Sequence, residues 1–572
     1  MHLAELLSLG TIEVLDLELA RTLCRLGGTD DPQLALAIAL TSRSVRRGHT
    51  CLHLPTAANE LWPKEAAPPG ALPDPSEWAE RLRASPLTQE GPLVLDGESR
   101  VYFRRYWQLE RDIAAELAAR AEPRTLPVDT AWLESTLARL CPGPEDSPQR
   151  RAARNALGYS VSLLCGGPGT GKTTTVASII ATLVERDMLA KGEPPKVMLL
   201  APTGKAAARL GEAVLEAKRR IDASSEVLAC IPTEASTVHR ALGMQRGGMR
   251  FRRSAALPLE ANVIVLDEAS MIDLALMRQL LDATPRDATL LIVGDPDQLT
   301  SVEAGSVLRD LVDASVKTWW QGRVTQLTKT WRYDETQPLG RLVQAIREGD
   351  GEAVDAILTA RDAVDVKWRP LDELPSELDL AAKFWSEATH TTTPARHFEL
   401  RGRYVMLTPF RRGRIGTERL GEAIRERLLS SGKPAVTPII IEQNSQELGV
   451  FNGDFAMLVD GAPRHAVVQR EAGDFPELAA ARLPRHSEAF AISVHKSQGS
   501  EFDEVLVVVP KDDAPLLTRE LLYTAVSRAR QRVRLVGPRE VVMAALRRKA
   551  ERHSGLVDAI AEVDDVPARN EG

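Results

Sequence analysis

The chain has 572 residues, of which 44% are hydrophobic and 26% are charged. At about 150 residues per domain this length predicts three or four folded domains, and the composition excludes a disordered or fibrous protein. The 72 basic and 79 acidic residues give a net charge of −7, which disfavours nonspecific coating of nucleic acid but permits a local DNA channel. No apolar run could span a bilayer and the first residues do not resemble a signal peptide, so we expect a cytoplasmic protein without membrane contact.

The cysteines are scattered along the chain and none of them forms a CxxC pair. They are Cys24, Cys51, Cys141, Cys165 and Cys230. This spacing predicts buried thiols and gives no indication of a disulfide framework, a zinc site or an iron–sulfur cluster.

Residues 1–110 are predicted to form a helical domain, because their apolar residues recur at helical spacing. Within this domain a short apolar run on either side of Asp96-Gly97 predicts a β-hairpin. Several prolines punctuate residues 111–145, and we interpret that segment as a linker into the next domain.

Two series of short β-rich runs alternating with helical segments follow, and this alternation predicts parallel sheets flanked by helices. The first series predicts an α/β domain over residues 146–335, and the second predicts another over residues 336–572. Residues 436–485 differ, because strand-like runs are separated there by Asn-Gly and Asp-Gly turns. We interpret them as a small β-barrel inserted in the second α/β domain.

Residues 166–173 fit the phosphate-loop pattern G-x-x-x-x-G-K-[ST], directly after a predicted strand and before a predicted helix. Lys172 supplies a charge to the β- and γ-phosphates of ATP, and Thr173 offers a hydroxyl to Mg²⁺. The candidate nucleotide-binding residues of this segment, with the residue that follows it, are Gly166, Gly167, Pro168, Gly169, Thr170, Gly171, Lys172, Thr173 and Thr174.

Three polar residues follow two later strands and complete a candidate ATPase site. Asp267 and Glu268 end the apolar run VIVL, where Asp267 can hold Mg²⁺ and Glu268 can polarise the attacking water. Gln298 follows the next strand, and its amide can sense the γ-phosphate or orient water.

Hydrolysis also requires positive charge against the γ-phosphate, and two arginines are candidates. Arg332 lies in LTKTWRYD and Arg528 lies in LLYTAVSRAR. Arg528 belongs to the second α/β domain, from which it could close over a nucleotide bound to the first.

Seven segments resemble the motifs of superfamily 1 helicases and occur in the same order. They are GGPGTGKT, APTGKAAARL, STVHRALG, VLDEASMID, GDPDQL, SVHKSQGSEFDEV and YTAVSRAR. With RVYFRRYWQLERDIAAEL and LGVFNGDF, they are most similar to the RecD family, which includes the alpha subunit of exodeoxyribonuclease V. The resemblance implies two RecA-like P-loop motor domains, a helical N-terminal domain and a small SH3-like β-barrel insertion.

The same resemblance implies roles for further residues. Gln149 matches the glutamine that recognises adenine, and Glu501 matches the residue that contacts the ribose. The residues that match the single-stranded DNA groove are Thr203, Thr237, His239, Ser493 and His495. Ser493 stands where relatives often carry Thr, which preserves the hydroxyl.

The activity implied is ATP- and Mg²⁺-dependent helicase movement from 5′ to 3′, within a heterotrimer with RecB-like and RecC-like subunits. Its substrates would be single-stranded DNA and the ends of double-stranded DNA, in double-strand break repair and homologous recombination. Two alternatives stay open: a stand-alone 5′-to-3′ helicase, and a regulatory subunit that controls a partner nuclease.

We also expect residues 1–110 to dock onto the partner subunits, because they carry apolar side chains but no nucleotide or DNA motif. The candidates for this surface are Trp62, Trp78, Leu93, Tyr102, Tyr106 and Trp107. For any one of the aromatic residues among them, a place in an ordinary small core is the alternative.

Overall fold

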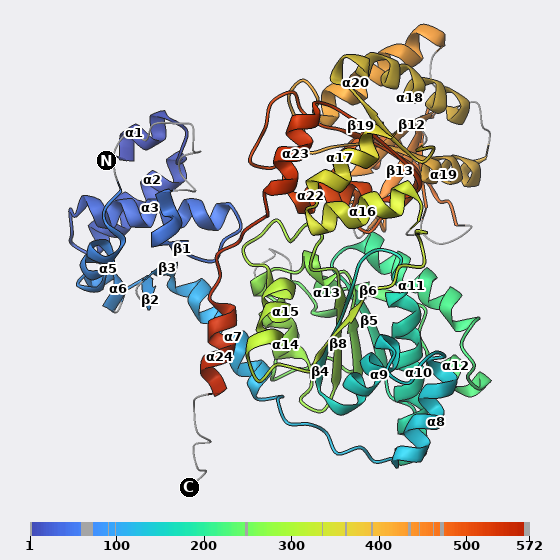
Figure 1. Ribbon diagram of the computed structural model, residues 1–572, viewed down its shortest axis with the longest axis horizontal. Coiled ribbons are helices and arrows are strands. Elements are labelled where there is room, and N and C mark those ends of the chain that lie inside the picture. Colours follow the sequence, from blue (N-terminus) through green and yellow to red (C-terminus); the bar gives the residue numbers. More distant parts are fainter. Residues whose placement is uncertain are drawn as a thin grey trace.

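The computed structural model describes most of the chain. The described residues are 3–58, 72–89, 91–97, 99–245, 250–334, 336–360, 363–389, 393–432, 436–445, 447–460, 463–469 and 474–564. Figure 1 shows a helical N-terminal domain beside two α/β domains that lie one above the other.

The N-terminal domain contains short helices and a three-stranded antiparallel sheet of order β1-β3-β2. Its elements are α1 (Leu3–Ser8), α2 (Val14–Leu26), α3 (Pro32–Arg46), β1 (Leu52–His53), α5 (Pro75–Arg83), α6 (Pro86–Gln89), β2 (Leu93–Asp96) and β3 (Arg100–Phe103). Asp96 pairs with Arg100 and Gly97 has a φ of 60°, which confirms the predicted hairpin. Helices α7 (Arg104–Ala118) and α8 (Thr130–Leu140) follow, so the expected linker at 111–145 contains much helix.

The first α/β domain is built on a six-stranded parallel sheet of order β6-β5-β7-β8-β4-β9. Its elements are α9 (Pro148–Gly158), β4 (Val161–Gly166), α10 (Lys172–Lys191), β5 (Val197–Ala201), α11 (Gly204–Lys218), α12 (Ser225–Cys230), β6 (Ala235–Thr237), α13 (Val238–Ala241), β7 (Val263–Leu266), α14 (Leu274–Ala283), β8 (Thr289–Gly294), α15 (Val307–Lys317) and β9 (Val324–Leu327). Strands β4, β7 and β8 are buried throughout, as their nearly continuous apolar sequences predict for a sheet covered on both faces.

The second α/β domain has a five-stranded parallel sheet of order β10-β19-β18-β11-β17. Its elements are α16 (Pro338–Glu348), α17 (Gly351–Thr359), β10 (Val366–Arg369), α18 (Leu374–Thr389), α19 (Pro394–Arg403), β11 (Tyr404–Thr408), α20 (Thr417–Ser431), β17 (Ala491–Ser493), α21 (Val494–Ser497), β18 (Phe502–Val508), α22 (Arg519–Val526), β19 (Ala529–Val536) and α23 (Arg539–Arg547). The two parallel sheets confirm the prediction of two α/β units.

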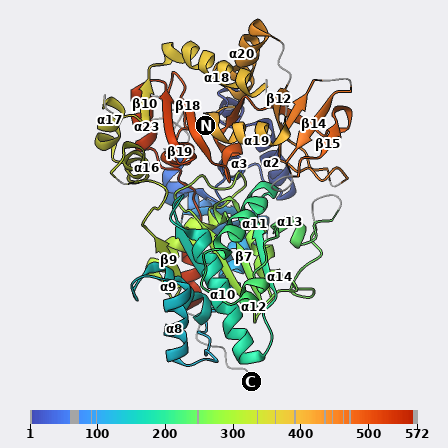
Figure 2. The same ribbon diagram turned by 90° about the vertical axis from the view of Figure 1, so that its right-hand side faces the viewer.

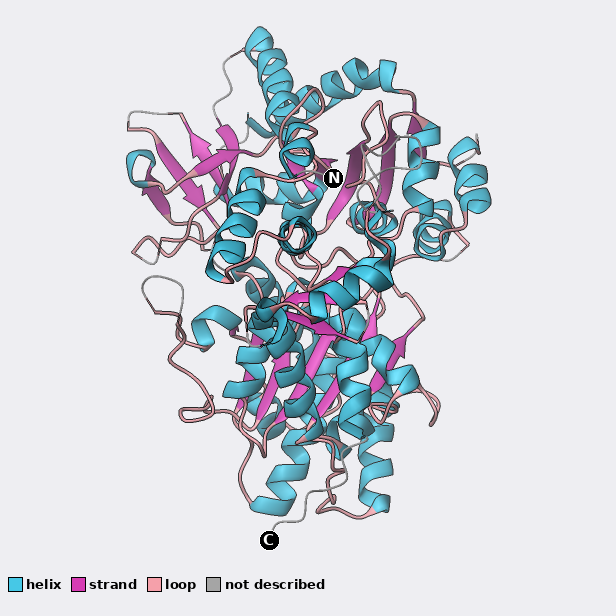
Figure 3. Cartoon of the chain, turned by 90° about the vertical axis from the view of Figure 1, so that its left-hand side faces the viewer, coloured by secondary structure: helices cyan, strands magenta, loops and turns pink. Residues whose placement is uncertain are grey.

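A separate antiparallel sheet of order β15-β14-β13-β12-β16 is inserted between α20 and β17. Its strands are β12 (Val436–Ile441), β13 (Phe455–Val459), β14 (His465–Val468), β15 (Glu477–Ala479) and β16 (His486–Glu488). In Figure 2 this inserted sheet projects from the side of the second α/β domain, and Figure 3 shows its strands apart from the parallel ones.

The last described helix, α24 (Leu556–Asp564), leaves the second α/β domain and packs against α7 and α15 (Figure 1). Leu556 and Ile560 are fully buried in the same hydrophobic cluster as residues of the first α/β domain. The C-terminal segment therefore returns to the first α/β domain, although its residues fall within the range 336–572 expected for the second.

Four cysteines are buried, Cys230 is half-buried and all five are free thiols. Within the described ranges no helix is both long and apolar enough to cross a membrane. The same part of the chain holds no cluster of three or more His, Cys, Asp or Glu side chains suited to a metal ion.

Candidate ATPase and DNA-binding site

The phosphate loop connects buried strand β4 to α10. Gly169 and Gly171 have φ values of 76° and 85°, a left-handed conformation that glycine adopts without strain. The Lys172 ammonium donates to the carbonyl oxygens of Gly166 at 2.6 Å and Gly167 at 3.0 Å. Because α10 starts at Lys172, its positive dipole end and the ammonium lie together at a site suited to phosphate.

The glycines of the loop are also required by close neighbours. A Cβ at Gly169 would lie 2.2 Å from the Cβ of Arg332, and a Cβ at Gly167 would lie 2.7 Å from the Tyr523 hydroxyl. The backbone N–H of Trp331 donates to the Gly169 carbonyl oxygen at 2.7 Å. Residues from both α/β domains therefore pack directly on the loop.

The strand order places β8 between β4 and β7, so their carboxyl ends lie side by side. Asp267 and Glu268 follow β7, and Gln298 follows β8. Glu268 has a φ of 52°, and no other non-glycine residue in the described ranges has a positive φ. Burial and the Glu268 charge raise the pKa of Asp267 to about 6, so a cation at this carboxylate pair would be stabilising. The acidic pair therefore fits Mg²⁺.

Gln298 and Arg528 are 230 residues apart in the sequence and meet at the contact between the two α/β domains. Arg528 Nη2 donates to Gln298 Oε1 at 3.0 Å, and Arg528 is only 2% exposed. The guanidinium also donates to the carbonyl oxygens of Thr524 at 3.1 Å and Ser500 at 3.3 Å. These bonds hold Arg528 at the turn after β8.

A cluster of arginines surrounds Glu501. Arg332 Nη2 donates to Glu501 Oε1 at 2.5 Å, Arg530 Nε lies 3.3 Å from Oε2, and Arg209 forms a further ion pair with Oε1. Burial and the charges of Arg332 and Arg528 lower the pKa of Arg209 to about 9. Three guanidinium groups on one carboxylate leave an excess of positive charge, as an anion site requires.

Sequence analysis did not identify Arg209. It lies in α11, inside APTGKAAARL, and only its three-dimensional contact with Glu501 separates it from an ordinary surface arginine on an amphipathic helix.

Gln149 lies in the first turn of α9, whose N-cap is Ser147. Only two residues separate α9 from β4, and the two elements pack together. An antiparallel helix of this kind places its first turn toward the phosphate-loop end of β4. The adenine role of Gln149 and the ribose role of Glu501 both stay predictions.

Three of the candidate DNA-binding residues share one local structure. Thr203 lies two residues after β5, whereas Thr237 and Ser493 are the last residues of the parallel strands β6 and β17. Each of the three caps the next helix. Their hydroxyl oxygens accept backbone N–H groups of those helices at 3.2, 3.2 and 3.4 Å. Each hydroxyl keeps its own proton, which could be donated to a phosphate oxygen.

The two candidate histidines lie close to these caps. Burial lowers the pKa of His239. Burial and the Arg552 charge lower the pKa of His495. Both imidazoles are therefore favoured in their neutral form, as hydrogen-bonding groups without charge.

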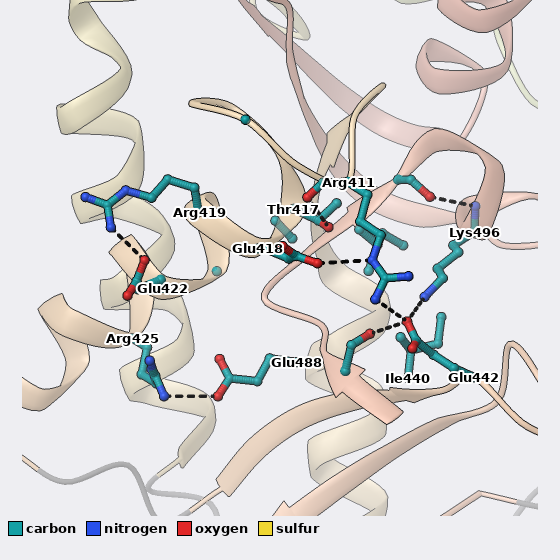
Figure 4. A pocket seen from close by; sticks show the side chains of 16 residues that line it. Arg411, Thr417, Glu418, Arg419, Glu422, Arg425, Ile440, Glu442, Glu488 and Lys496 are labelled. Atoms are coloured by element: carbon teal, nitrogen blue, oxygen red, sulfur yellow. Dashed lines mark hydrogen bonds and ion pairs between the residues drawn. The ribbon is translucent and has the colours of Figure 1, made fainter. Parts of the chain in front are cut away.

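A pocket of about 510 Å³ lies between α20, the inserted sheet and α21 (Figure 4). Ser493 and Lys496 line one wall, and arginines of α20 line another. Burial alone would raise the pKa of Glu442, but hydrogen bonds from Lys496 and Ser487 and the charges of Lys496 and Arg411 hold it at about 2. Charged side chains of both signs thus line the pocket, together with one of the candidate DNA-binding residues, Ser493.

Three family models match the chain. Residues 8–102 match the "RecBCD enzyme subunit RecD, N-terminal domain", residues 149–304 an AAA domain, and residues 488–536 a "UvrD-like helicase C-terminal domain".

Curated relatives match nearly the whole chain. The RecBCD enzyme subunit RecD of Mycobacterium tuberculosis is 39% identical over 96% of this chain and 94% of its own length. The corresponding subunit of Mycolicibacterium smegmatis is 36% identical over 95% of this chain and 97% of its own. The ATP-dependent RecD2 DNA helicase of Deinococcus radiodurans is 29% identical over 93% of this chain, but only 70% of that protein is covered. The chain belongs to the family of RecBCD enzyme RecD subunits.

Proposed function

We propose that the chain is an ATP-dependent 5′-to-3′ DNA helicase that works as the RecD subunit of a complex with RecB-like and RecC-like partners. The observation that supports this most directly is the contact of Arg528 with Gln298 beside the phosphate loop. It joins the two α/β domains at the turn next to the ATP site, so ATP binding and hydrolysis could change how these domains approach each other. The names of the relatives supply the substrate and the partners.

ATP would lie with its phosphates on the loop at Lys172, and Thr173 and Asp267 would hold Mg²⁺, which screens the phosphate charge when bound. Glu268 would orient the attacking water. Arg332 and Arg528 would stabilise negative charge that develops on the γ-phosphate.

Single-stranded DNA would cross both α/β domains over the capping residues. Thr203 lies two residues beyond the end of β5, and Thr237 is the last residue of the neighbouring strand β6, where it pairs with Ala201. Ser493 would continue the path on the second domain, next to the pocket of Figure 4. The neutral hydroxyl and imidazole donors would bind phosphates without raising the net charge of the chain.

The finer domain description is also a proposal. Residues 1–110 would be the docking domain, residues 146–335 and 336–572 the two motor domains, and the inserted sheet an SH3-like barrel. The position of α24 suggests one change, in which the C-terminal helix belongs with the first motor domain.

The match of residues 8–102 to the RecD N-terminal model favours a complex subunit over the stand-alone helicase. The coverage of only 70% of the Deinococcus helicase favours it as well. The network around Arg528 disfavours a purely regulatory subunit, because such a subunit would not need its ATPase residues held in contact.

The test is unwinding of 5′-tailed and 3′-tailed duplexes by the chain alone and after co-purification with its partners. We expect unwinding of the 5′-tailed duplex, displacement of streptavidin from the 3′ end of an oligonucleotide, and loss of both with Lys172→Ala. Displacement from the 5′ end would contradict the proposed direction. Full unwinding by the chain alone would favour the stand-alone alternative.

A further inference from the structure

Tyr523 lies on α22 of the second α/β domain, but its hydroxyl reaches into the first. The side chain is 2% exposed, and its hydroxyl donates to Asp295 Oδ2 at 3.0 Å. The Tyr523 hydroxyl oxygen also lies 2.7 Å from the position that a Cβ at Gly167 would occupy. Tyr523 therefore touches both the phosphate loop and the turn after β8.

The Asp295 carboxylate is the acceptor at the centre of this turn, and it is 2% exposed. Its Oδ1 accepts the Asp297 N–H at 3.1 Å, and its Oδ2 accepts Gln298 Nε2 at 2.9 Å as well as the Tyr523 hydroxyl. Burial and the Asp295 charge raise the pKa of Tyr523 well above its usual range, so the phenol remains protonated and donates.

The Gln298 amide can satisfy its neighbours in only one orientation. Its Nε2 donates to Asp295, while its Oε1 accepts from Arg528. A reversed amide would place an NH₂ group against a guanidinium, and neither group can accept. Asp295 therefore determines which end of the Gln298 amide faces Arg528.

We propose that Tyr523 is a positioning residue for ATP hydrolysis, which acts through Asp295 and Gln298 on Arg528. Tyr523 and Arg528 belong to the second α/β domain, whereas Asp295 and Gln298 belong to the first. The chain of hydrogen bonds from Tyr523 to Arg528 is complete only when the two domains are in contact. Tyr523 would thus help to make hydrolysis depend on domain closure. This inference rests on the proposed ATPase function.

The test is Tyr523→Phe in the full chain, which removes the hydroxyl and keeps the ring. Steady-state ATPase is measured with saturating single-stranded oligonucleotide and varied ATP. We expect kcat to fall about tenfold, the scale of one lost buried hydrogen bond, while KM for ATP stays within about twofold. In a Gln298→Ala background the same substitution should lower kcat by less than about twofold. The Gln298 amide, through which Tyr523 would act on Arg528, is already missing there.

Tyr404→Phe is the matched control. Tyr404 is a buried tyrosine of β11 whose hydroxyl has no hydrogen-bond partner in the described part of the chain. Its removal should leave kcat unchanged.

An unchanged kcat for Tyr523→Phe would overturn the inference, whether or not KM for ATP is raised. A further tenfold loss of kcat when Tyr523→Phe is added to Gln298→Ala would overturn it as well. A wild-type rate no higher than that of Lys172→Ala would instead overturn the proposed ATPase and this inference with it.

Discussion

Arg528 illustrates what the structure adds at the scale of a single residue. The sequence predicted an arginine that reaches across the domains, and the structure places it on Gln298 beside the phosphate loop. Because such an arginine acts mainly on charge that develops in the transition state, Arg528→Ala should lower kcat about 10³-fold and leave ATP affinity nearly normal. Fluorescent-nucleotide titration beside DNA-saturated ATPase measures both. A loss of affinity with a normal saturated rate would make Arg528 a ground-state binding residue.

Asp310 on α15 gives a second prediction at this scale. It is 8% exposed, and within the described ranges its Oδ2 has no hydrogen-bond partner. Burial raises its pKa from 3.8 to about 8. The folded state therefore holds a proton that the unfolded state releases above pH 3.8, so this residue lowers stability as pH rises from about 4 to 8.

Asp310→Asn removes this titration. The variant's gain in free energy of unfolding over the wild type should be larger at pH 8 than at pH 5. The difference should be about 4 kcal/mol, or about 1.4 kcal/mol for each of the three pH units. Denaturant unfolding at the two pH values measures the difference. Asp313→Asn, at an exposed site on the same helix, is the control and should show no such difference. An equal gap at both pH values would show that Asp310 is ionised in the folded protein.

At the scale of elements, sequence patterns within a short segment predicted those features of the fold that depend on interactions within that segment. The loop at 166–173, the hairpin at Asp96-Gly97 and the buried strands follow from turn chemistry and apolar runs. The Arg209–Glu501 ion pair could not be predicted, because the two residues are far apart in sequence and each has an ordinary local context. The sequence gives Thr203 only a resemblance to a DNA-binding residue, whereas the structure also shows its hydroxyl accepting the Ala206 N–H.

The return of α24 to the first α/β domain likewise depends on contacts distant in sequence. Ile560 is fully buried against that domain, whereas its neighbour Ala561 is exposed. Ile560→Asp should lower the free energy of unfolding by about 3 kcal/mol or more and make the C-terminal segment sensitive to protease. Ala561→Asp adds the same charge to the same helix and should change stability by less than about 0.5 kcal/mol. Equal protease resistance of the two variants would exclude α24 as a stabilising element.

At the scale of the whole molecule, the structure corrects which side chains of the N-terminal domain are available to partners. Trp78, Leu93 and Tyr102 are at most 1% exposed and form the domain core. Trp62 lies outside the described residues, and Tyr106 and Trp107 are half-buried. Helical and strand periodicity alone could not separate core from surface, because an aromatic residue suits either. Docking through Trp78, Leu93 and Tyr102 is therefore wrong, and the alternative of an ordinary core holds for these buried side chains.

A group of exposed apolar residues of this domain lies elsewhere, around the start of α2, and Leu26 at the end of the same helix is also exposed. Leu9, Val14 and Leu15 are 58%, 64% and 62% exposed, and α1 and α2 lie away from the first parallel sheet (Figure 1). Neighbouring exposed apolar side chains mark an interaction surface more often than a lone one does.

If partner subunits cover this patch, Leu15→Asp should bury a charge in the interface and weaken assembly at least tenfold. Co-purification with RecB-like and RecC-like subunits, followed by titration of the purified chain against them, measures this loss. Leu189→Asp is the matched control, because Leu189 of α10 is also 62% exposed but lies on the first α/β domain. Both variants should keep the DNA-stimulated ATPase of the isolated chain, since neither residue touches the phosphate loop or Arg528. Wild-type assembly of Leu15→Asp, or equal weakening by Leu189→Asp, would move the docking surface away from α2.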